Sequence, residues 1–346
     1  MNIIEQDLEH ILEHTRDLWD ELRGKRIFIT GGTGFFGRWL LESFSYANKK
    51  MNLNARVTVL SRNPDAFICR APELCSNPAI TFCRGDVRDF TYPKEDYPFI
   101  IHGATAASAK LNVNDLEPLV LFDTIVHGTR RTLDFAIQTH CHKFLFISSG
   151  AVYGKQPDYM THIPESHIGG LDTIDPNSIY GEAKRAAELL CAIYHKRYPD
   201  IETKIARCFT FVGPHMPLNA HFAIGNFIRN ALHGEQISVK GDGTPCRSYL
   251  YAADLTIWLW TILFRAQPCR PYNVGSGDSV SILETANAVA NLANPPLPVS
   301  VALQPENRPT QRYVPNVSRA ELELGLTRKI SLRDSIYRTM SFSTYS

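Results

Sequence analysis

The chain has 346 residues, of which 36 are Lys or Arg and 35 are Asp or Glu, so its formal net charge is +1. Apolar residues make up 44% of the sequence and charged residues 21%. These fractions are ordinary for a globular protein and exclude disorder, collagen or coiled coil as a description of the whole chain. The near-zero charge gives no electrostatic reason to expect nucleic acid or a membrane surface as a partner.

Signals for membranes, export and metal binding are weak. The longest nearly apolar run, Ile257–Phe264, is much shorter than the roughly 20 residues that a spanning helix needs. The first residues are acidic and lack the basic region of a signal peptide, and the eight cysteines are scattered without a Cys-x-x-Cys pair. The sequence therefore predicts a cytoplasmic protein with reduced thiols. His140-Cys141-His142 imitates a metal cluster, but it lies between a helical pattern and a strand and predicts a turn, so no metal is expected.

Residues 1–24 form an extension in front of the first predicted strand. Apolar residues recur near helical spacing from Ile4 to Leu22, and Gly24 follows them. This pattern predicts a helix over residues 1–23 that ends at the glycine. We expect this helix to pack on the main body or on a second subunit.

From residue 25 the sequence alternates between short apolar runs and amphipathic stretches. Strands are predicted at residues 26–30, 56–60, 80–83, 99–102, 144–148, 204–208 and 272–274, and helices at residues 38–46, 124–139, 178–198 and 281–293. Such alternation is typical of right-handed βαβ units and predicts an α/β fold, a Rossmann-type doubly wound parallel sheet. Residues 25–210 are expected to hold most of this domain. Residues 211–346 are expected to form mainly a smaller C-terminal lobe, with some elements that return to the sheet.

The strongest local motif is Thr30-Gly31-Gly32-Thr33-Gly34-Phe35-Phe36-Gly37, which follows a predicted strand and begins a predicted helix. Gly31 permits a tight turn, Gly34 lets the backbone approach a pyrophosphate, and Gly37 lets the helix pack closely on the sheet. The helix N-terminus then offers N–H groups to phosphates. The alternative is a glycine-rich turn without a ligand. The motif predicts a dinucleotide site with contacts from Gly31, Thr33, Gly34, Phe35, Phe36 and Gly37.

Tyr180 and Lys184 are four residues apart on the predicted helix 178–198, so they share one face. An ammonium group beside a phenol favours the phenolate and lowers the phenol pKa from about 10. Tyr180 can then act as a general acid or base near neutral pH. A Tyr-x-x-x-Lys pair is common on surfaces, but here it follows a dinucleotide motif and the fifth strand.

The Gly-x-x-Gly-x-x-Gly spacing and the Tyr-x-x-x-Lys pair resemble the extended short-chain dehydrogenase/reductase superfamily, particularly its nucleotide-sugar epimerases and dehydratases. The resemblance covers most of residues 25–330 and implies NAD(P) as the cofactor. It implies that Ser149 is the third catalytic residue beside Tyr180 and Lys184, and that Tyr180 and Lys184 also touch the cofactor. Further implied cofactor contacts are Asp86, Val87, Gly103 and Ala104.

The residues at the end of the second predicted strand should determine whether the cofactor is NAD or NADP. A carboxylate there binds the ribose 2′-hydroxyl of NAD, whereas an arginine suits a 2′-phosphate. The chain has Ser61 and Arg62 at this point, and no carboxylate before Asp65. Charge and hydrogen-bond geometry therefore favour NADP, although Arg62 could instead stack on the adenine.

The resemblance also implies a nucleoside-diphosphate sugar as the substrate, bound by the C-terminal lobe. Thr210 stands where the family usually has Asn in a substrate-binding segment. Arg247 resembles the arginine that grips the diphosphate, and Arg308 or Arg312 could supply a second clamp. Each arginine could also be a solvated surface charge. Ser149 and Gly150 are expected to contact the sugar.

Two positions depart from the family pattern. The 4,6-dehydratases of the family have Asp-Glu, and its decarboxylases have Glu at the second position, where this chain has Gly150 and Ala151. Elimination of water across C5 and C6 needs an acid and a base that Gly and Ala do not supply. Both activities are therefore disfavoured. Many relatives have Asn where Ile125 stands, which puts the family's proton relay through that position in doubt.

These expectations converge on hydride transfer at a sugar carbon, in first place C4. Tyr180 takes the hydroxyl proton, Ser149 orients the oxygen, and Lys184 holds the ribose. The first expectation is an epimerase, which returns the hydride to the other face of the sugar, and the alternative is an NADPH-dependent 4-keto-sugar reductase. A dinucleotide-sensing protein without catalysis is the non-enzyme alternative. Relatives often dimerise, and here the helices over residues 113–139 and 178–198 would form a homodimer contact.

Overall fold

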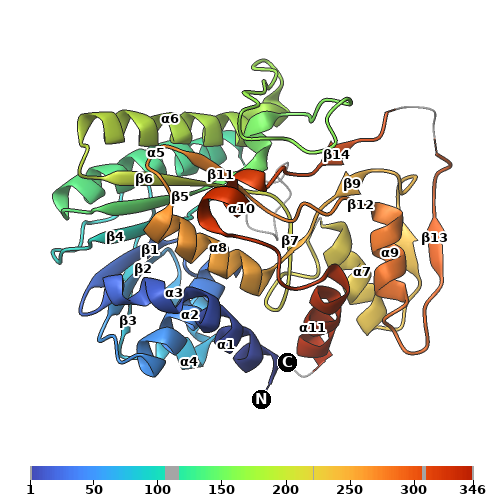
Figure 1. Cartoon of the computed structure of the whole chain (residues 1–346), viewed down its shortest axis with the longest axis horizontal. Coiled ribbons are helices and arrows are strands. Elements are labelled where there is room, and N and C mark those ends of the chain that lie inside the picture. The colour runs from blue at the N-terminus through green and yellow to red at the C-terminus, as the bar shows by residue number, and fades with distance from the viewer. Residues whose placement is uncertain (1, 106–116, 221, 306–308, 345–346) are drawn as a thin grey trace.

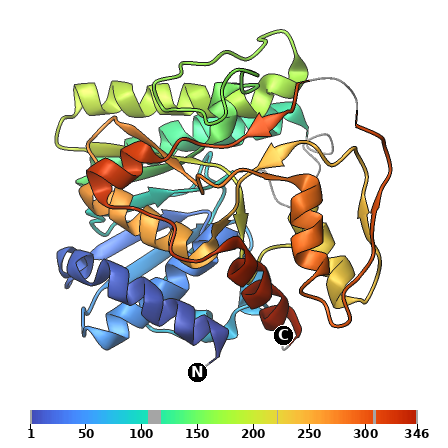
Figure 2. The ribbon, with the colours of Figure 1, turned by 45° about the vertical axis from the view of Figure 1, so that its right-hand side comes forward.

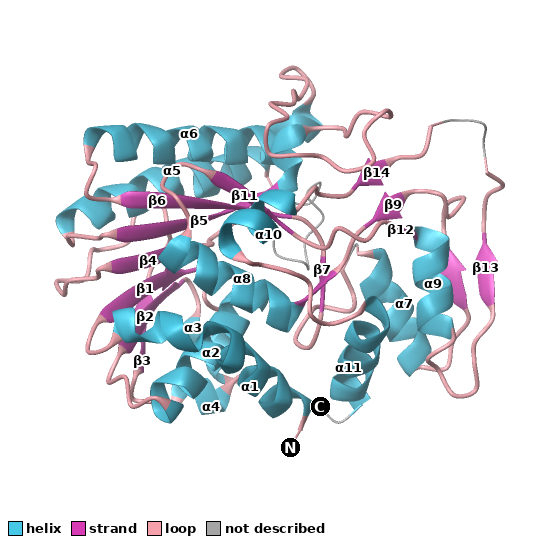
Figure 3. Cartoon of the chain, in the orientation of Figure 1, coloured by secondary structure: helices cyan, strands magenta, loops and turns pink. Residues whose placement is uncertain are grey.

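The computed structural model describes residues 2–105, 117–220, 222–305 and 309–344. Its centre is a sheet of seven parallel strands in the order β3-β2-β1-β4-β5-β6-β11 (Figures 1 and 3). The strand order reverses between β1 and β4, which is where doubly wound sheets bind ligands. The strands are β1 (Arg26–Thr30), β2 (Arg56–Ser61), β3 (Ile80–Arg84), β4 (Phe99–His102), β5 (Lys143–Ser149), β6 (Glu202–Cys208) and β11 (Pro271–Val274).

Helices cover both faces of this sheet because its strands are apolar on both sides. Phe28 of β1 lies in one core with α5 (Pro118–Gln138) and α6 (Ile179–Arg197). Ile27 and Ile29 lie in the other core with α2 (Phe35–Lys50) and α8 (Ala252–Arg265). Side chains alternate across a strand, so neighbouring residues of β1 belong to two different cores. The predicted Rossmann-type doubly wound sheet is confirmed.

The apolar run Ile257–Phe264 forms most of α8, and every residue from Ala252 to Phe264 is buried. A helix that is apolar all round is typical of the interior of a large protein. Among the helices of the described ranges, none has both the length and the apolar character to cross a membrane.

β11 and α8 both come from residues 211–346 and lie in the sheet domain, and the division of the chain near residue 210 stays a prediction.

The N-terminal extension is helical, but it is not one continuous α-helix. α1 covers Ile3–Thr15, and a 3-10 helix follows over Arg16–Leu22. The predicted helix is therefore present up to Leu22, but its last seven residues form a 3-10 helix instead of an α-helix. The hydroxyl of Thr15 donates to the carbonyl oxygen of Ile11 at 2.6 Å and accepts the indole N–H of Trp19 at 2.9 Å. Such side-chain hydrogen bonds compete with the regular helix, which accounts for the change at Thr15.

A smaller lobe with its own core lies beside the sheet domain (Figure 2). It contains α7 (Ala223–Leu232), α9 (Ile282–Ala290), α11 (Leu332–Thr344) and the parallel pair β8 (Ile237–Val239) and β13 (Val299–Val301). The remaining short elements are α3 (Pro64–Ile68), α4 (Pro72–Cys75), 3-10 turns at Gly150–Tyr153 and Pro176–Ser178, β7 (Phe211–Val212), β9 (Cys246–Arg247), β10 (Leu250–Tyr251), β12 (Val280–Ser281), β14 (Arg312–Tyr313) and α10 (Ser318–Leu324).

Candidate active site

The turn between β1 and α2 depends on two glycines. Gly31 has a φ of +74°, and a Cβ atom at this position would lie 2.6 Å from the backbone of Gly103. A Cβ atom on Gly37 would lie 2.3 Å from the Cα atom of Gly32. The close approach of strand, helix and neighbouring loop is therefore possible only without side chains at these positions.

Gly34 has a different role from these two glycines. A Cβ atom there would meet only the carbonyl oxygen of Gly31, at 3.4 Å, so the position is uncrowded on the protein side. Gly34 is the N-cap of α2 and provides no side-chain cap, so the first amides of the helix are not covered by a capping group. Such an end favours a phosphate. Thr33, Phe35 and Phe36 complete the turn, and this cradle fits a dinucleotide.

The predicted adenosine contacts lie at the ends of β2 and β3. The carboxylate of Asp86 accepts two hydrogen bonds from the guanidinium of Arg88, at 2.9 and 3.1 Å. This contact is the main reason why the pKa of Asp86 is lowered, and the nearby charge of Arg62 lowers it further. The Ser61 hydroxyl accepts the N–H of Asn63 at 3.3 Å. Two arginines therefore lie near the carboxylate that is expected to meet the adenine.

Val87 and Ala104 are two further predicted cofactor contacts. Val87 is buried and packs against Gly128 of α5, so its side chain faces the core. The N–H of Ala104 donates to the Thr30 hydroxyl at 3.1 Å. Any contact with a cofactor at Val87 is left to its main chain.

Ser149 and Tyr180 meet at the carboxyl end of β5. The Ser149 hydroxyl hydrogen-bonds the phenol of Tyr180 and accepts the N–H of Ala151 at 3.1 Å. Burial raises the pKa of Tyr180 by more than the Ser149 hydrogen bond lowers it. The sequence argument expected Lys184 to lower this pKa. In the free protein burial outweighs any such effect, and Tyr180 is protonated at neutral pH.

Lys184 lies one helical turn from Tyr180 and is only 2% exposed. Its ammonium group donates to the carbonyl oxygen of Ile147 at 2.8 Å and lies 4.8 Å from the ring centre of Phe146. Burial lowers the pKa of Lys184 to about 8. The geometry holds the ammonium at the carboxyl end of the sheet, close to Ser149.

His102 is a neutral, fully buried neighbour of this group. Burial and the charge of Lys184 lower the pKa of His102 to about 3. Its two ring nitrogens lie 2.7 Å from the Thr30 hydroxyl and 3.0 Å from the Thr129 hydroxyl. The His102 ring of β4 therefore links β1 and α5 through these two hydrogen bonds.

Tyr313 is a second phenol at the site, and the sequence analysis did not find it. Its hydroxyl hydrogen-bonds Ser149, while burial and the adjacent Tyr180 raise the pKa of Tyr313. A Cβ atom on Gly150 would lie 2.7 Å from this hydroxyl and 2.8 Å from the ring of Phe209. Tyr313 and Phe209 therefore fill the space that a larger residue at position 150 would need.

The predicted substrate arginines do not share one location. β9 and β14 are parallel, and Arg247 lies directly opposite Tyr313. Opposite residues of paired strands point to the same face, and the charge of Arg247 acts on the Tyr313 phenol. Arg312 precedes Tyr313 on β14 and therefore points to the other face, and Arg308 lies outside the described residues. The structure therefore places the charge of Arg247 beside Tyr313, whereas the Arg312 guanidinium donates to the carbonyl oxygen of Thr310 at 3.4 Å.

Thr210 links two parts of the C-terminal half. Its hydroxyl donates to the carbonyl oxygen of Ser248, and its own carbonyl accepts the N–H of Leu250 at 3.1 Å. Thr210 thus fixes the segment that carries Arg247, and its hydroxyl already has a partner.

Arg88 lies in the motif Gly85-Asp86-Val87-Arg88-Asp89 but was given no role of its own, and Tyr313 belongs to no motif recognised in the sequence. Arg88 lies two residues after Asp86, and this short spacing is the one local signal for their ion pair. Tyr313 has no local signal, because it reaches Ser149 only through the pairing of β14 with β9.

A hollow of about 910 Å³ lies elsewhere, next to α1, α2 and α4, and none of Ser149, Tyr180 and Lys184 lines it.

The class of protein follows from these features together with one comparison. Residues 27–275 match the NAD dependent epimerase/dehydratase family. The chain belongs to this family of NAD-dependent enzymes, as the resemblance in its motifs implied.

Individual relatives cover nearly the whole chain. UDP-glucuronic acid decarboxylases 5 and 3 of Arabidopsis thaliana are 30% and 31% identical to it, over 90% of this chain and 87% and 86% of theirs. An epimerase of Methanothermobacter thermautotrophicus has a TM-score of 0.78, with 22% identity over 95% of each chain. The UDP-glucuronic acid 4-epimerase of Bacillus cereus, solved with UDP-glucuronic acid and NAD, has a TM-score of 0.76, with 21% identity over 92% of this chain and 99% of that one. These structures share the fold.

Proposed function

We propose that the chain oxidises and re-reduces C4 of a nucleoside-diphosphate sugar and acts as a 4-epimerase. The observation that carries this proposal is the Ser149–Tyr180 hydrogen bond at the carboxyl end of β5, with the Lys184 ammonium one turn away. A bound oxidised nicotinamide supplies hydride acceptance and return, together with a positive charge.

The residues of the chain handle the proton and the orientation of the sugar. Tyr180 accepts the proton of the C4 hydroxyl at its phenolic oxygen and returns it once the keto sugar presents its other face. Because burial raises the pKa of Tyr180 in the free protein, a cation near the phenol must favour the phenolate during turnover. Ser149 orients the sugar oxygen, and Arg247 is placed to bind the diphosphate.

The surroundings of C5 support an epimerase. Gly150 and Ala151 offer no carboxylate there, and Tyr313 and Phe209 occupy the space beside Gly150. A reaction confined to C4 needs no acid or base at C5 or C6.

A second candidate, decarboxylation of UDP-glucuronic acid, is favoured by the relatives that are 30% and 31% identical over 90% of the chain. Oxidation at C4 turns the C6 carboxylate into that of a β-keto acid. The C5–C6 bond then breaks with loss of CO₂, its electrons form an enolate toward C4, and solvent supplies the proton that is added at C5. A bound reduced nicotinamide would supply the hydride that converts the C4 ketone back to an alcohol. The loss of CO₂ needs no base at C5, so Gly150 and Ala151 do not forbid this step.

One experiment distinguishes these candidate reactions. The purified protein is incubated with a panel of nucleotide sugars that includes UDP-glucuronic acid and a 4-keto sugar, with NAD, NADP or NADPH, and the products are analysed by mass spectrometry and NMR. A product of unchanged mass with inverted C4 supports the epimerase, and loss of CO₂ supports the decarboxylase. A keto sugar that gains two hydrogens from NADPH indicates a reductase. Equal conversion by the Tyr180→Phe variant would contradict the proposed chemistry, and tight cofactor binding without turnover of any nucleotide sugar favours a sensor.

We also propose a preference for NADP over NAD. Arg62 is exposed and lies near the Asp86 carboxylate, which is already paired with Arg88, so the Arg62 guanidinium is available at the adenosine end. The ratio of the dissociation constants for NAD and NADP is the measurement, and Arg62→Ala should reduce the preference by about 10-fold, as expected for a charge-assisted bond of about 1.5 kcal/mol. A clear preference of the unaltered protein for NAD would refute this.

A homodimer through α5 and α6 is a further part of the proposal. Leu119, Leu189 and Ile193 on these helices are 68%, 61% and 48% exposed, respectively. Both helices lie on one outer side of the molecule in Figure 1. Light scattering after size-exclusion chromatography should give twice the chain mass, and Leu189→Glu with Ile193→Glu should give the monomer. A monomer in the unaltered protein would contradict the dimer.

A further inference from the structure

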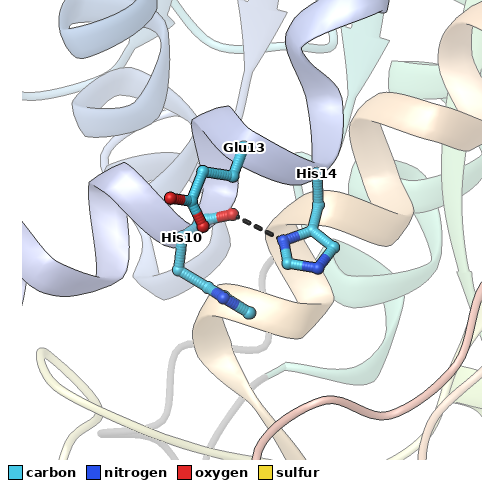
Figure 4. A group of neighbouring side chains, drawn as sticks. All are labelled: His10, Glu13 and His14. Carbon is cyan, nitrogen blue, oxygen red and sulfur yellow. Dashed lines mark hydrogen bonds between the residues drawn. The ribbon is translucent and has the colours of Figure 1, made fainter.

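Three side chains of α1 form a cluster that the proposed enzyme activity does not use. His10, Glu13 and His14 each offer one ligand atom, and these atoms lie within 4.8 Å of one another. Figure 4 shows the three side chains about one turn apart on the same side of α1. The i, i+3 and i+4 spacing places them one turn apart, and two histidines at i and i+4 are a recurrent pair of zinc ligands.

The hydrogen bond of His14 leaves a nitrogen free to bind a cation. Its Nδ1 atom lies 2.9 Å from the carbonyl oxygen of His10. A carbonyl oxygen only accepts, so Nδ1 carries the hydrogen and Nε2 keeps its lone pair in the neutral ring. His14 and Glu13 are exposed, so an ion can reach the cluster from solvent.

His10 has a buried carboxylate behind it. Its Nε2 atom lies 3.5 Å from Oδ1 of Asp254, and neither atom has a hydrogen-bond partner within the described ranges. The Asp254 side chain is fully buried, and its Oδ2 atom is fixed by the N–H groups of Lys329 and Ile330 at 2.9 and 3.0 Å. Metal-bound histidines characteristically donate their other ring N–H to such a carboxylate, which leaves the remaining nitrogen basic.

We propose that His10, Glu13 and His14 bind a zinc ion, with Asp254 orienting His10. Two imidazole nitrogens and one carboxylate oxygen suit Zn²⁺, and water completes the tetrahedron. In one class of peptidases the two histidines of the same order, His-x-x-Glu-His, bind zinc. In α1 the Glu13 carboxylate is close enough to both histidines to be a third ligand. All three ligands belong to α1, so the ion braces the last turn before Thr15, where the α-helix changes to a 3-10 helix. The site is structural and separate from the dinucleotide turn.

The test is a titration of the full chain after treatment with a chelator and dialysis. Zn²⁺ affinity is measured by competition with a chromophoric chelator, and Co²⁺ binding by visible absorption. We expect one ion per chain with micromolar affinity, a loss of at least 50-fold in His14→Ala and of about 10-fold in Glu13→Gln. Asp254→Asn should weaken binding while the Co²⁺ spectrum keeps its tetrahedral character.

His233→Ala is the matched control. His233 is also exposed near the end of a helix, and its Nδ1 atom lies 2.8 Å from the carbonyl oxygen of Arg229, four residues earlier. The control should leave Zn²⁺ affinity unchanged. Absence of saturable binding, retention of full affinity in His14→Ala, or binding only at a shared site between two chains would overturn the proposal. In each of those cases the His10–Asp254 contact has no metal role.

Discussion

Ser149 has a single hydroxyl hydrogen and lies between two phenols. Tyr180 and Tyr313 both hydrogen-bond it, and it also accepts the N–H of Ala151. A serine hydroxyl has one donor and two acceptor positions, so these three contacts satisfy it. One phenol therefore donates to the Ser149 oxygen while the other accepts the Ser149 hydrogen, and only Tyr180 has an ammonium group one turn away.

The two tyrosines should differ sharply when their hydroxyls are removed. Tyr180→Phe loses the proton carrier, and kcat should fall about 10²–10⁴-fold. Tyr313→Phe loses one hydrogen bond of about 1 kcal/mol, so kcat should fall only about fivefold. Steady-state kinetics on the converted sugar is the measurement, with Tyr337→Phe, exposed on α11, as the control. A larger loss for Tyr313→Phe than for Tyr180→Phe would assign the proton transfer to Tyr313.

His102 makes stability depend on pH below neutrality. Its pKa is lowered to about 3 in the folded chain, while in the unfolded chain it remains near 6.5. Between these values the unfolded state binds the extra proton, so the free energy of unfolding falls as pH falls. The slope from this residue is about 1.4 kcal/mol per pH unit.

Urea unfolding of the chain and of His102→Gln between pH 4 and pH 7 isolates this contribution. We expect the variant to show the shallower slope, because glutamine does not titrate. Equal slopes for both proteins would mean that His102 is already protonated in the folded state.

At the scale of elements, the unit that matters most is the turn from β1 into α2. Gly31 and Gly37 are required by close backbone contacts, whereas Gly34 is uncrowded and caps the helix. Fold stability and cofactor binding therefore depend on different glycines of one short motif. Substitutions at Gly34 and Gly37 should separate the two roles.

Gly37→Ala should lower the free energy of unfolding by about 1–3 kcal/mol, because its Cβ atom would collide with Gly32. Gly34→Ala should leave stability nearly unchanged, since its φ of −88° suits alanine. It should weaken dinucleotide binding about 10-fold or more by blocking the approach of a phosphate. Gly170→Ala, at a position without close neighbours, is the control. Unfolding and cofactor titrations should show opposite patterns for Gly34→Ala and Gly37→Ala, and identical patterns would disprove the division.

At the scale of the whole molecule, α1 connects the sheet domain to the C-terminal helix. Asp7 of α1 is completely buried and accepts hydrogen bonds from Tyr251 of β10 and Arg338 of α11. Burial raises the pKa of Asp7, and its two partners oppose that shift. α1 and α11 lie side by side in Figures 1 and 2, so residues near both chain ends share one buried contact.

Loss of this carboxylate should be costly. Asp7→Ala leaves Arg338 and the Tyr251 hydroxyl without their buried partner, and the free energy of unfolding should fall by about 2–4 kcal/mol. Asp17→Ala removes the exposed pair with Arg265 and should change stability by less than about 1 kcal/mol. Urea unfolding measures both, and equal losses would show that α1 is not anchored through Asp7.

Most of the sheet domain was predictable from the sequence. Strands and helices alternate with periods that residues 26–30 or 178–198 display locally, and the glycine motif and the Tyr180–Lys184 spacing need only their neighbours in the chain. In the second half the helix predicted at residues 281–293 is α9, whereas α8 was not predicted, because it is apolar all round and shows no amphipathic face. The 3-10 segment after Thr15 depends on one side-chain hydrogen bond that periodicity does not encode.

The alternation of strands and helices, the glycine turn and the Tyr180–Lys184 spacing are local patterns, so the class of fold and these two motifs could be predicted from the sequence, while Ser149 came from the family resemblance. Only the tertiary structure decided which side chains surround these three residues. Tyr313 reaches Ser149, the charge of Arg247 lies beside Tyr313, and Asp254 lies behind His10, all across long stretches of chain. These contacts depend on strand pairing and helix packing between distant segments, which impose no local pattern on the sequence.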